Sequence, residues 1–321
     1  MRHFLIALAF ALVTTHSVDA QQDARAARLS VLPVQGSVYL ISGAGVNITV
    51  HIGKYGVVLV DTPQPARVPQ VMEEIRKLSS LPIRYIINTS VNAEHVAGNA
   101  ALVAPVGGRG AGGAPFGFVG LGRPSIVAHE QVLNRLANPT AGAPQTSPDA
   151  LPTTTYFLPS MDFSNGEAII LYHQPAAHTD SDSVVLFRGS DVISTGAVFT
   201  PGRYPVIDVE RGGSVHGLIS ALTSILALAV PEGFASGGTR IVPGRGRICE
   251  ETDVAEFRDM VVIIRDRVQD LVMKGLALEQ VKAAKPSRDY DAEYGANAAD
   301  ADRFVEAIYR SLTQVKTGGR S

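Results

Sequence analysis

The sequence lacks several features that would indicate a functional class directly: paired cysteines, runs of basic residues and a serine-hydrolase motif. Cys249 is the only cysteine among 321 residues, so no intrachain disulfide can form. The formal net charge is -2 and no long run of Lys or Arg occurs, which gives no electrostatic footprint for nucleic acid or an anionic membrane. No Gly-x-Ser-x-Gly segment is present, so the nucleophile elbow of serine hydrolases is absent. The expected partner is therefore a small ligand or another protein.

The N-terminus has the three regions of a secretory signal. Arg2 and His3 precede an apolar run over residues 4–13, and small residues follow as far as Ala20. This run is too short for a membrane anchor, because a bilayer requires about 20 apolar residues. We predict export to the periplasm or the exterior with cleavage after Ala20, which leaves no membrane span. The alternative is a buried N-terminal helix.

The remaining chain, residues 21–321, is rich enough in apolar residues to form one large domain. Hydrophobic residues make up 45% and charged residues 18% of the sequence. Short β-branched runs bounded by glycine predict strands at 37–42, 47–52, 57–60 and 83–88, and a second set that begins near Tyr156 predicts strands at 168–172, 183–188, 192–195 and 239–242. Apolar residues at helical spacing predict helices at 68–78, 215–228 and 252–273. This order favours an α/β fold of two similar halves, about 30–150 and 151–321, packed sheet against sheet.

Residues 88–99 read Asn-Thr-Ser-Val-Asn-Ala-Glu-His-Val-Ala-Gly-Asn and follow a predicted strand. The segment resembles the His-x-His-x-Asp-His signature of the metallo-β-lactamase superfamily. Four weaker landmarks share the resemblance in the same order, at 60–62, 177–183, 194–199 and 241–246. Together they imply the four-layered αβ/βα sandwich of that superfamily, in its exported branch, over nearly all of the chain from about Gly36.

The resemblance also implies where the ligands of two metal ions would lie. Each ion would take three side chains, and a seventh would bridge the two. The first set corresponds to Ser90, Asn92 and His178, the second to Glu94, His95 and Arg245, and the bridge to Ala197.

Most of these side chains are poor zinc ligands. Zinc favours imidazole, thiolate and carboxylate, whereas Ser and Asn bind it weakly, Ala cannot bind it, and Arg is a permanent cation. Only Glu94, His95 and His178 remain as candidate ligands, or as candidate catalytic groups. We expect that the dinuclear site is lost, that no cofactor is bound and that the chain is a non-hydrolytic binding protein. The alternative is a hydrolase of a lactam, lactone or ester that uses one zinc ion or a metal-free site, so enzyme activity stays open.

The substituted positions suggest two further hypotheses. Arg245 and Glu94 stand where they would have shared one metal, so the guanidinium could form a bidentate ion pair with Glu94. Alternatively, Arg245 points to solvent. His178 could be a general base oriented by Asp180 or Asp182, although descent from a ligand motif also explains it.

Two long segments, 103–124 and 137–152, are poor in core-forming residues and predict surface loops. The first contains Gly-x-Gly-x-x-Gly spacing at 108–113, but no helix can follow it as a dinucleotide site requires. Phe116 and Phe118 in this segment could instead cover an apolar ligand if it borders the cleft.

Overall fold

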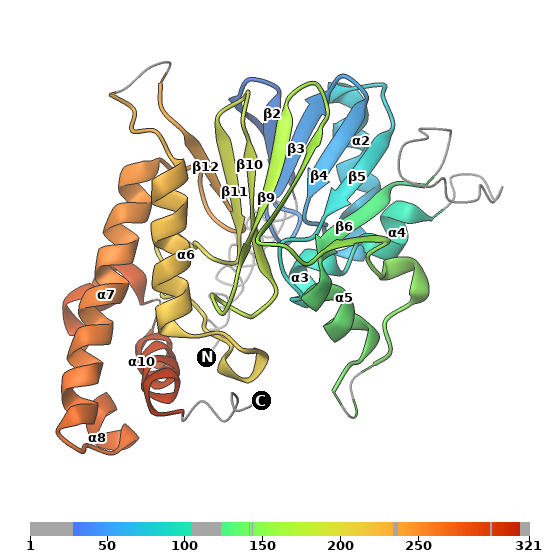
Figure 1. Ribbon diagram of the computed structural model, residues 1–321. Coiled ribbons are helices and arrows are strands. Elements are labelled where there is room, and N and C mark those ends of the chain that lie inside the picture. The colour runs from blue at the N-terminus through green and yellow to red at the C-terminus, as the bar shows by residue number, and fades with distance from the viewer. Residues whose placement is uncertain are drawn as a thin grey trace, which may run out of the picture.

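The chain forms two β-sheets that pack face to face, with helices on both outer sides (Figure 1). The computed structural model describes residues 28–104, 123–140, 142, 144–233, 237–295 and 297–314. The predicted signal at residues 1–20, the Gly-x-Gly-x-x-Gly spacing, Phe116 and Phe118 lie outside these residues.

The first sheet is seven-stranded and runs β1-β2-β3-β4-β5-β6-β7 in chain order. Pairing is antiparallel from β1 to β4 and parallel from β4 to β7. Its strands are β1 (Ser30–Gln35), β2 (Val38–Ser42), β3 (Ile48–Gly53), β4 (Gly56–Val60), β5 (Ile83–Ile87), β6 (Ser125–His129) and β7 (Thr154–Tyr156).

The second sheet is five-stranded with the order β12-β11-β10-β9-β8. Only β11 and β12 pair in parallel. Its strands are β8 (Ser160–Ser164), β9 (Ala168–Gln174), β10 (Asp182–Phe187), β11 (Val192–Gly196) and β12 (Arg240–Pro243).

The helices connect these strands or follow the last one. The α-helices are α2 (Val68–Leu78), α3 (Ala93–Val96), α4 (Asn99–Val103), α5 (Glu130–Ala137), α6 (Val215–Leu228), α7 (Glu251–Met273), α8 (Leu278–Ala283), α9 (Asp291–Tyr294) and α10 (Ala298–Thr313). Short 3₁₀ turns lie at Pro65–Arg67, Pro148–Ala150, Val209–Arg211 and Arg288–Tyr290. None of the helices in the described ranges is long and apolar enough to cross a membrane.

The central strands β4 and β10 are buried on both faces, because successive side chains point to opposite sides of a sheet and each side is covered. In β4, Val58 and Val60 face the second sheet, where they join Val185 and Phe187 of β10 in a core between the sheets. The neighbouring side chains of β4 pack instead beneath α2.

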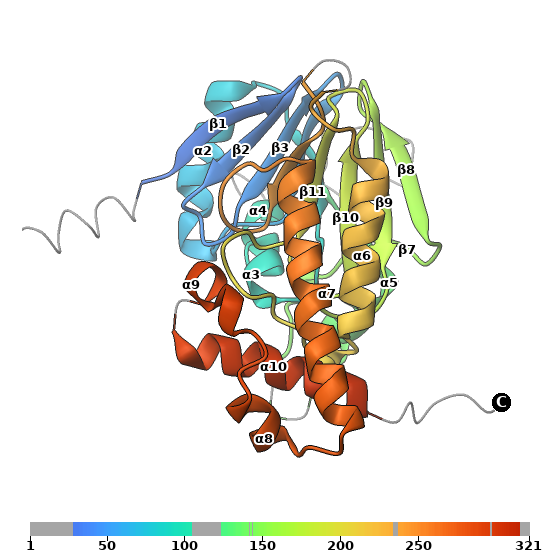
Figure 2. The same ribbon diagram turned by 90° about the vertical axis from the view of Figure 1, so that its left-hand side faces the viewer.

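Helices cover the outer face of the second sheet in the same way. Val184 and Leu186 of β10 pack in one cluster with Leu222 of α6 and Ile264 of α7. Figure 2 shows α6 and α7 side by side across this face, with α10 crossing near their lower ends. The result is the predicted order of four layers, helix, sheet, sheet and helix.

Several sequence predictions are confirmed and one needs correction. The helices predicted at 68–78 and 215–228 match α2 and α6, because their apolar spacing reflects one buried face. The strand near Tyr156 was predicted to open the second half, but β7 pairs with β6 and completes the first sheet. The sequence did not predict strands β1 and β8, because none of their side chains is fully buried and no clear apolar run marks them.

The end of β11 makes a close contact that admits only glycine. Gly196 has a φ of +52°, and a Cβ atom there would lie 2.2 Å from Thr89 Oγ1 in the first half of the chain. Gly202 is also left-handed, at φ +68°, but has open space around it.

We predict that Gly196→Ala lowers the free energy of unfolding by about 3 kcal/mol, since it adds a clash to the backbone strain. Gly202→Ala is the matched control and should cost only about 1 kcal/mol, because it adds strain alone. Urea unfolding of both variants measures the difference. Equal losses would show that the contact with Thr89 is not tight.

Candidate functional site

The positions that correspond to metal ligands in the resembled superfamily lie at one edge of the paired sheets. Asp61 follows β4 and residue 88 follows β5, while Ala197 follows β11 and Gly244 follows β12. Both strand pairs are parallel, so each pair delivers its carboxyl ends to a common edge, where open α/β sheets usually carry their sites. The two edges are joined by backbone hydrogen bonds from Asn47 to Gly244 and from Ser183 to Thr89, both 2.8 Å.

Asp61 is the buried centre of this edge. Its backbone is left-handed at φ 63°, which is uncommon for a residue other than glycine. One carboxylate oxygen accepts the Thr89 backbone N–H at 2.8 Å, and the Thr89 hydroxyl lies within 2.9 Å of both oxygens. The second oxygen meets His95 Nδ1 at 2.7 Å. The strained conformation therefore orients one carboxylate toward both partners.

His95 lies between two carboxylates. Its Nδ1 is bonded to Asp61, and its Nε2 lies 3.6 Å from Glu94 Oε1, which is an ion-pair contact rather than a hydrogen bond. Burial disfavours the imidazolium, but Asp61 and Glu94 outweigh it and raise the pKa of His95 to about 10. Because zinc needs the neutral imidazole, zinc could bind His95 only by displacing a proton from this ring.

Glu94 forms an ion pair with Arg245 through Nη2, and Arg245 Nη1 donates to the Gly45 carbonyl at 2.7 Å. The ion pair predicted from the sequence is confirmed, while its bidentate form is wrong because the backbone of Gly45 takes the second nitrogen. Arg245 therefore does not simply point to solvent. His95 and Arg245 lower the pKa of Glu94 to about 2, against the opposite effect of its partial burial.

His178 is held by two uncharged partners. Its Nδ1 donates to the Val206 carbonyl at 2.6 Å, which leaves Nε2 as the acceptor for the Asn92 amide at 2.5 Å. Arg211 donates to the amide oxygen of Asn92 at 3.2 Å. The nitrogen that would face a metal thus already accepts a hydrogen bond.

The proposed orientation of His178 by a carboxylate is wrong. Asp180 accepts two hydrogen bonds from Arg135, at 2.6 and 2.7 Å. Asp182 accepts the backbone N–H of Thr179 at 2.6 Å, and burial raises the pKa of its carboxyl. Neither is hydrogen-bonded to His178, because each already serves a structural contact.

The other substituted positions offer nothing to a cation. Ser90 is buried, and its hydroxyl has no partner of hydrogen-bonding geometry among the described residues, although it lies close enough to favour the charged form of Asp182. Ala197 supplies only a methyl group at the bridge position. The Thr195 hydroxyl nearby is likewise buried and unpaired within the described ranges.

These contacts do not fit a zinc ion. The positions that resemble the first ligand set hold a hydrogen-bonded pair of His178 and Asn92, and those that resemble the second set hold an ion pair of Glu94 and Arg245. Across the described part of the chain, no group of three or more His, Cys, Asp or Glu side chains could hold a metal ion. The structure brings Glu94 and His95 together, whereas the bonds of His178 go to Asn92 and Val206.

A cavity of about 330 Å³ opens beside Arg245. Its walls come from the β2–β3 turn, the loop after β11 and the loop after β12, and Arg203 contributes a second guanidinium. The sequence contains no signal for Arg203, because a single arginine after a loop glycine resembles any exposed residue. Asp61 was recognised only as a strand-end landmark, and its role depends on a backbone conformation that no local pattern predicts.

Comparisons with known proteins support the fold. No protein-family model and no curated protein matches the sequence. Among solved structures, a metallo-β-lactamase from Pontibacter korlensis is similar with a TM-score of 0.54 and 14% identity, over 73% of this chain and 99% of that one. The stereoselective inverting sec-alkylsulfatase Pisa1 from Pseudomonas sp. has a TM-score of 0.61 and 16% identity, over 89% of this chain and 50% of that one. The chain therefore has the metallo-β-lactamase fold, as its motifs predicted.

The Asp61–His95 pair predicts a pH dependence of stability. The pKa of His95 in the folded protein lies above the usual value of 6.5, so the stability that it contributes is complete below pH 6.5 and is lost as pH rises toward 10. Glu94, with a lowered pKa, contributes fully above 4.5 and loses its contribution as pH falls toward 2.

Replacing Asp61 by Asn should lower the free energy of unfolding by about 3 kcal/mol at pH 6, because it leaves a buried cation without its main partner. The loss of stability between pH 6.5 and 10 should become shallower, since the pKa of His95 falls. Denaturant unfolding across this range measures both effects, with Asp149→Asn, in an exposed ion pair with Arg123, as control. An unchanged pH profile would show that His95 is neutral in the native protein.

Proposed function

We propose that this chain is an exported protein of metallo-β-lactamase fold that binds a small ligand or a protein partner without hydrolysing it, and that no metal ion takes part. The observation that carries the proposal is the ion pair between Glu94 and Arg245. These two side chains occupy positions that the resemblance gives to ligands of one metal.

The ion pair supplies the structural charge of the missing ion. A zinc ion neutralises a carboxylate and links distant loops. The Arg245 guanidinium does both, because it contacts Glu94 and also donates to the carbonyl of Gly45 in the β2–β3 turn. It cannot activate water as a metal does, since it has no open coordination position and does not lower the pKa of a bound water to near 7. The Arg245 guanidinium can therefore hold the loops together as a metal ion would, but it supplies no activated water as a nucleophile.

The two histidines of the site, His95 and His178, also argue against hydrolysis. A hydrolase of this fold needs a free imidazole or a metal-bound hydroxide close to the substrate. His178 Nε2 accepts a hydrogen bond from Asn92, and His95 is a buried cation between carboxylates. His95 is therefore not available as a base near neutral pH, and the Nε2 atom of His178 is already engaged by Asn92.

Binding remains possible because the edge of the sheets keeps a cavity beside the ion pair. A volume of about 330 Å³ is at the lower end of small-ligand pockets, which span about 300 to 1,000 Å³. Export follows from the signal-like N-terminus and would place this cavity in the periplasm or outside the cell.

The alternative function is hydrolysis of a lactam, lactone or ester by a single zinc ion or by a metal-free site of Glu94, His95 and His178. It is favoured by the names of the structural neighbours, a metallo-β-lactamase and a sec-alkylsulfatase. A shared fold is weak support for a shared reaction, because function belongs to the site.

Metal analysis separates the two functions. After purification in zinc-containing buffer, the protein should carry far less than one zinc ion per chain, and nitrocefin and ester hydrolysis should stay at background with or without chelator. Arg245→Ala should lower the free energy of unfolding by about 1 kcal/mol, a modest loss because the pair is partly exposed. Arg76→Ala, an exposed arginine on α2, is the control. Stoichiometric zinc with activity that a chelator abolishes would establish the single-zinc form of the alternative, and activity that a chelator does not affect would establish its metal-free form.

Restoring the ligands should restore the metal. The combined variant Ser90→His, Asn92→His, Glu94→Asp, Ala197→Asp and Arg245→His should bind zinc tightly, because the backbone already presents these positions at one edge. Isothermal titration of the folded variant with zinc measures the affinity, and the parent protein is the control. A folded variant that binds no zinc would show that the positions are not equivalent to the ligands of the superfamily.

A further inference from the structure

The cavity beside Arg245 is lined by two arginines and by no acidic side chain. Backbone and small or uncharged residues from three loops form its walls, and the cations are Arg203 and Arg245. The lining residues are Ser42, Gly43, Gly45, Val46, Asn47, Thr200, Pro201, Arg203, Arg245 and Gly246. The charge of this cavity is therefore positive.

Arg245 has hydrogen-bonding capacity left after its structural contacts. Glu94 and the Gly45 carbonyl accept one bond each, whereas a guanidinium has five N–H donors. The ion pair also fixes the side chain in place, so little rotamer entropy is lost when a ligand binds it. Arg245 is a pre-oriented donor at the cavity wall.

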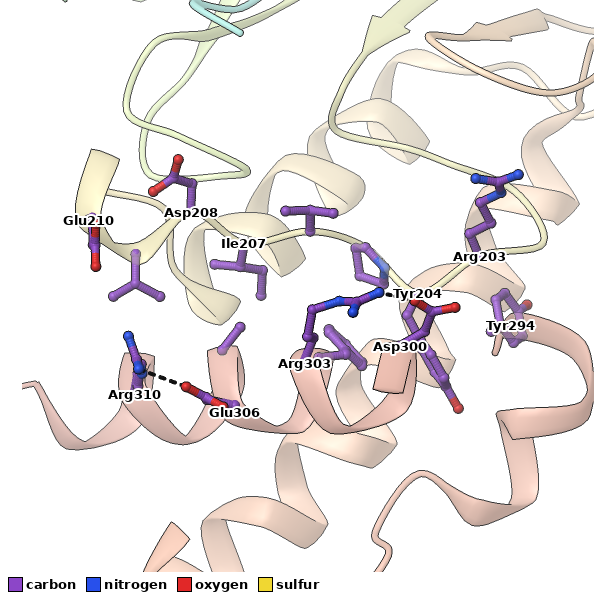
Figure 3. A pocket seen from close by; sticks show the side chains of 15 residues that line it. Arg203, Tyr204, Ile207, Asp208, Glu210, Tyr294, Asp300, Arg303, Glu306 and Arg310 are labelled. Carbon is purple, nitrogen blue, oxygen red and sulfur yellow. Dashed lines mark hydrogen bonds and ion pairs between the residues drawn. The ribbon is translucent and has the colours of Figure 1, made fainter. Parts of the chain in front are cut away.

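Arg203 has no ion pair or side-chain hydrogen bond with any described residue. It lies between the 330 Å³ cavity and a larger one of about 590 Å³ against α10, and lines both. Figure 3 shows its guanidinium directed away from Tyr294 and Asp300. The acids on α10 do not neutralise it, because Asp300 pairs with Arg303 and Glu306 pairs with Arg310.

The charges at the cavity determine which anion fits. Two guanidinium groups and the Glu94 carboxylate leave one positive charge without a partner. A monoanion balances this charge, and a planar carboxylate matches the fork of an arginine. A phosphate dianion would place excess negative charge beside Glu94.

Asn47 adds a second requirement. Its amide nitrogen donates to the carbonyls of Pro243 and Gly246, both at 2.9 Å, which fixes the orientation of the amide. Its oxygen accepts no hydrogen bond from the described residues and can accept one from a ligand.

We infer that this cavity is a binding site for a small organic monocarboxylate that also carries an N–H or hydroxyl donor, with Arg203 and Arg245 holding the carboxylate and Asn47 accepting from the donor. This binding site rests on the proposed function in one respect. Arg245 can bind a ligand in the cavity only while it is paired with Glu94 and no metal ion takes its place.

Isothermal titration of the mature protein with N-acetylglycine tests the inference, because this probe has one carboxylate and one amide N–H. The dissociation constant should be on the order of 1 mM, typical of a small fragment. Arg203→Ala should weaken binding about tenfold, as expected when a charge-assisted hydrogen bond is lost. Arg76→Ala removes the same charge away from the cavity and should leave binding unchanged. N-acetylglycinamide, the neutral isostere, should not bind detectably.

The other outcomes overturn the inference. Equal binding to the wild-type and Arg203→Ala proteins would remove the assignment to this cavity, and tighter binding of inorganic phosphate would remove the choice of a monocarboxylate. No binding by a protein that is free of zinc would overturn this site while leaving the proposed function intact. Stoichiometric zinc in the same sample, with binding abolished by chelator, would overturn both.

Discussion

Asp61 holds three groups with one carboxylate, and the arrangement of the whole site depends on this. It fixes the Thr89 backbone and hydroxyl at the end of β5, and it pairs with His95 in the loop that follows. Gly196 in the second sheet then packs against the same Thr89. A buried charge is costly unless it is paired and hydrogen-bonded, so these contacts must form together. The two halves of the chain meet around this cluster.

The consequence is a site whose loops are held together by hydrogen bonds and ion pairs between their side chains. His95 keeps its place because Asp61 bonds its Nδ1, but the same carboxylate, with Glu94, keeps it protonated. Arg245 forms an ion pair with Glu94 and donates a hydrogen bond to the carbonyl of Gly45. The Asn92 amide donates a hydrogen bond to Nε2 of His178. Each pair links separate loops at this edge of the sheets. The Arg245 guanidinium also lines the cavity, together with Arg203.

Most of the fold could be predicted from the sequence, because it is encoded in local periodicity. The buried faces of α2 and α6 repeat at helical spacing, and the central strands are β-branched runs bounded by glycine. The motif order also indicated the sandwich and the ion pair of Glu94 with Arg245. The partners of His178 were not predictable, since Val206 and Asn92 lie far from it in the chain and have no diagnostic residue type. The placement of β7 depended on pairing with β6, and the role of Arg203 on loop packing, which no sequence period encodes.

The absence of a metal at this site is best tested with crystals soaked in zinc, through an anomalous difference map at the zinc absorption edge. We expect no peak among Glu94, His95 and His178, with the Arg245 guanidinium on Glu94 and the Asn92 amide on His178. A strong peak at that position, with Arg245 or Asn92 displaced from its partner, would show that the site binds a metal and that the proposed function is wrong.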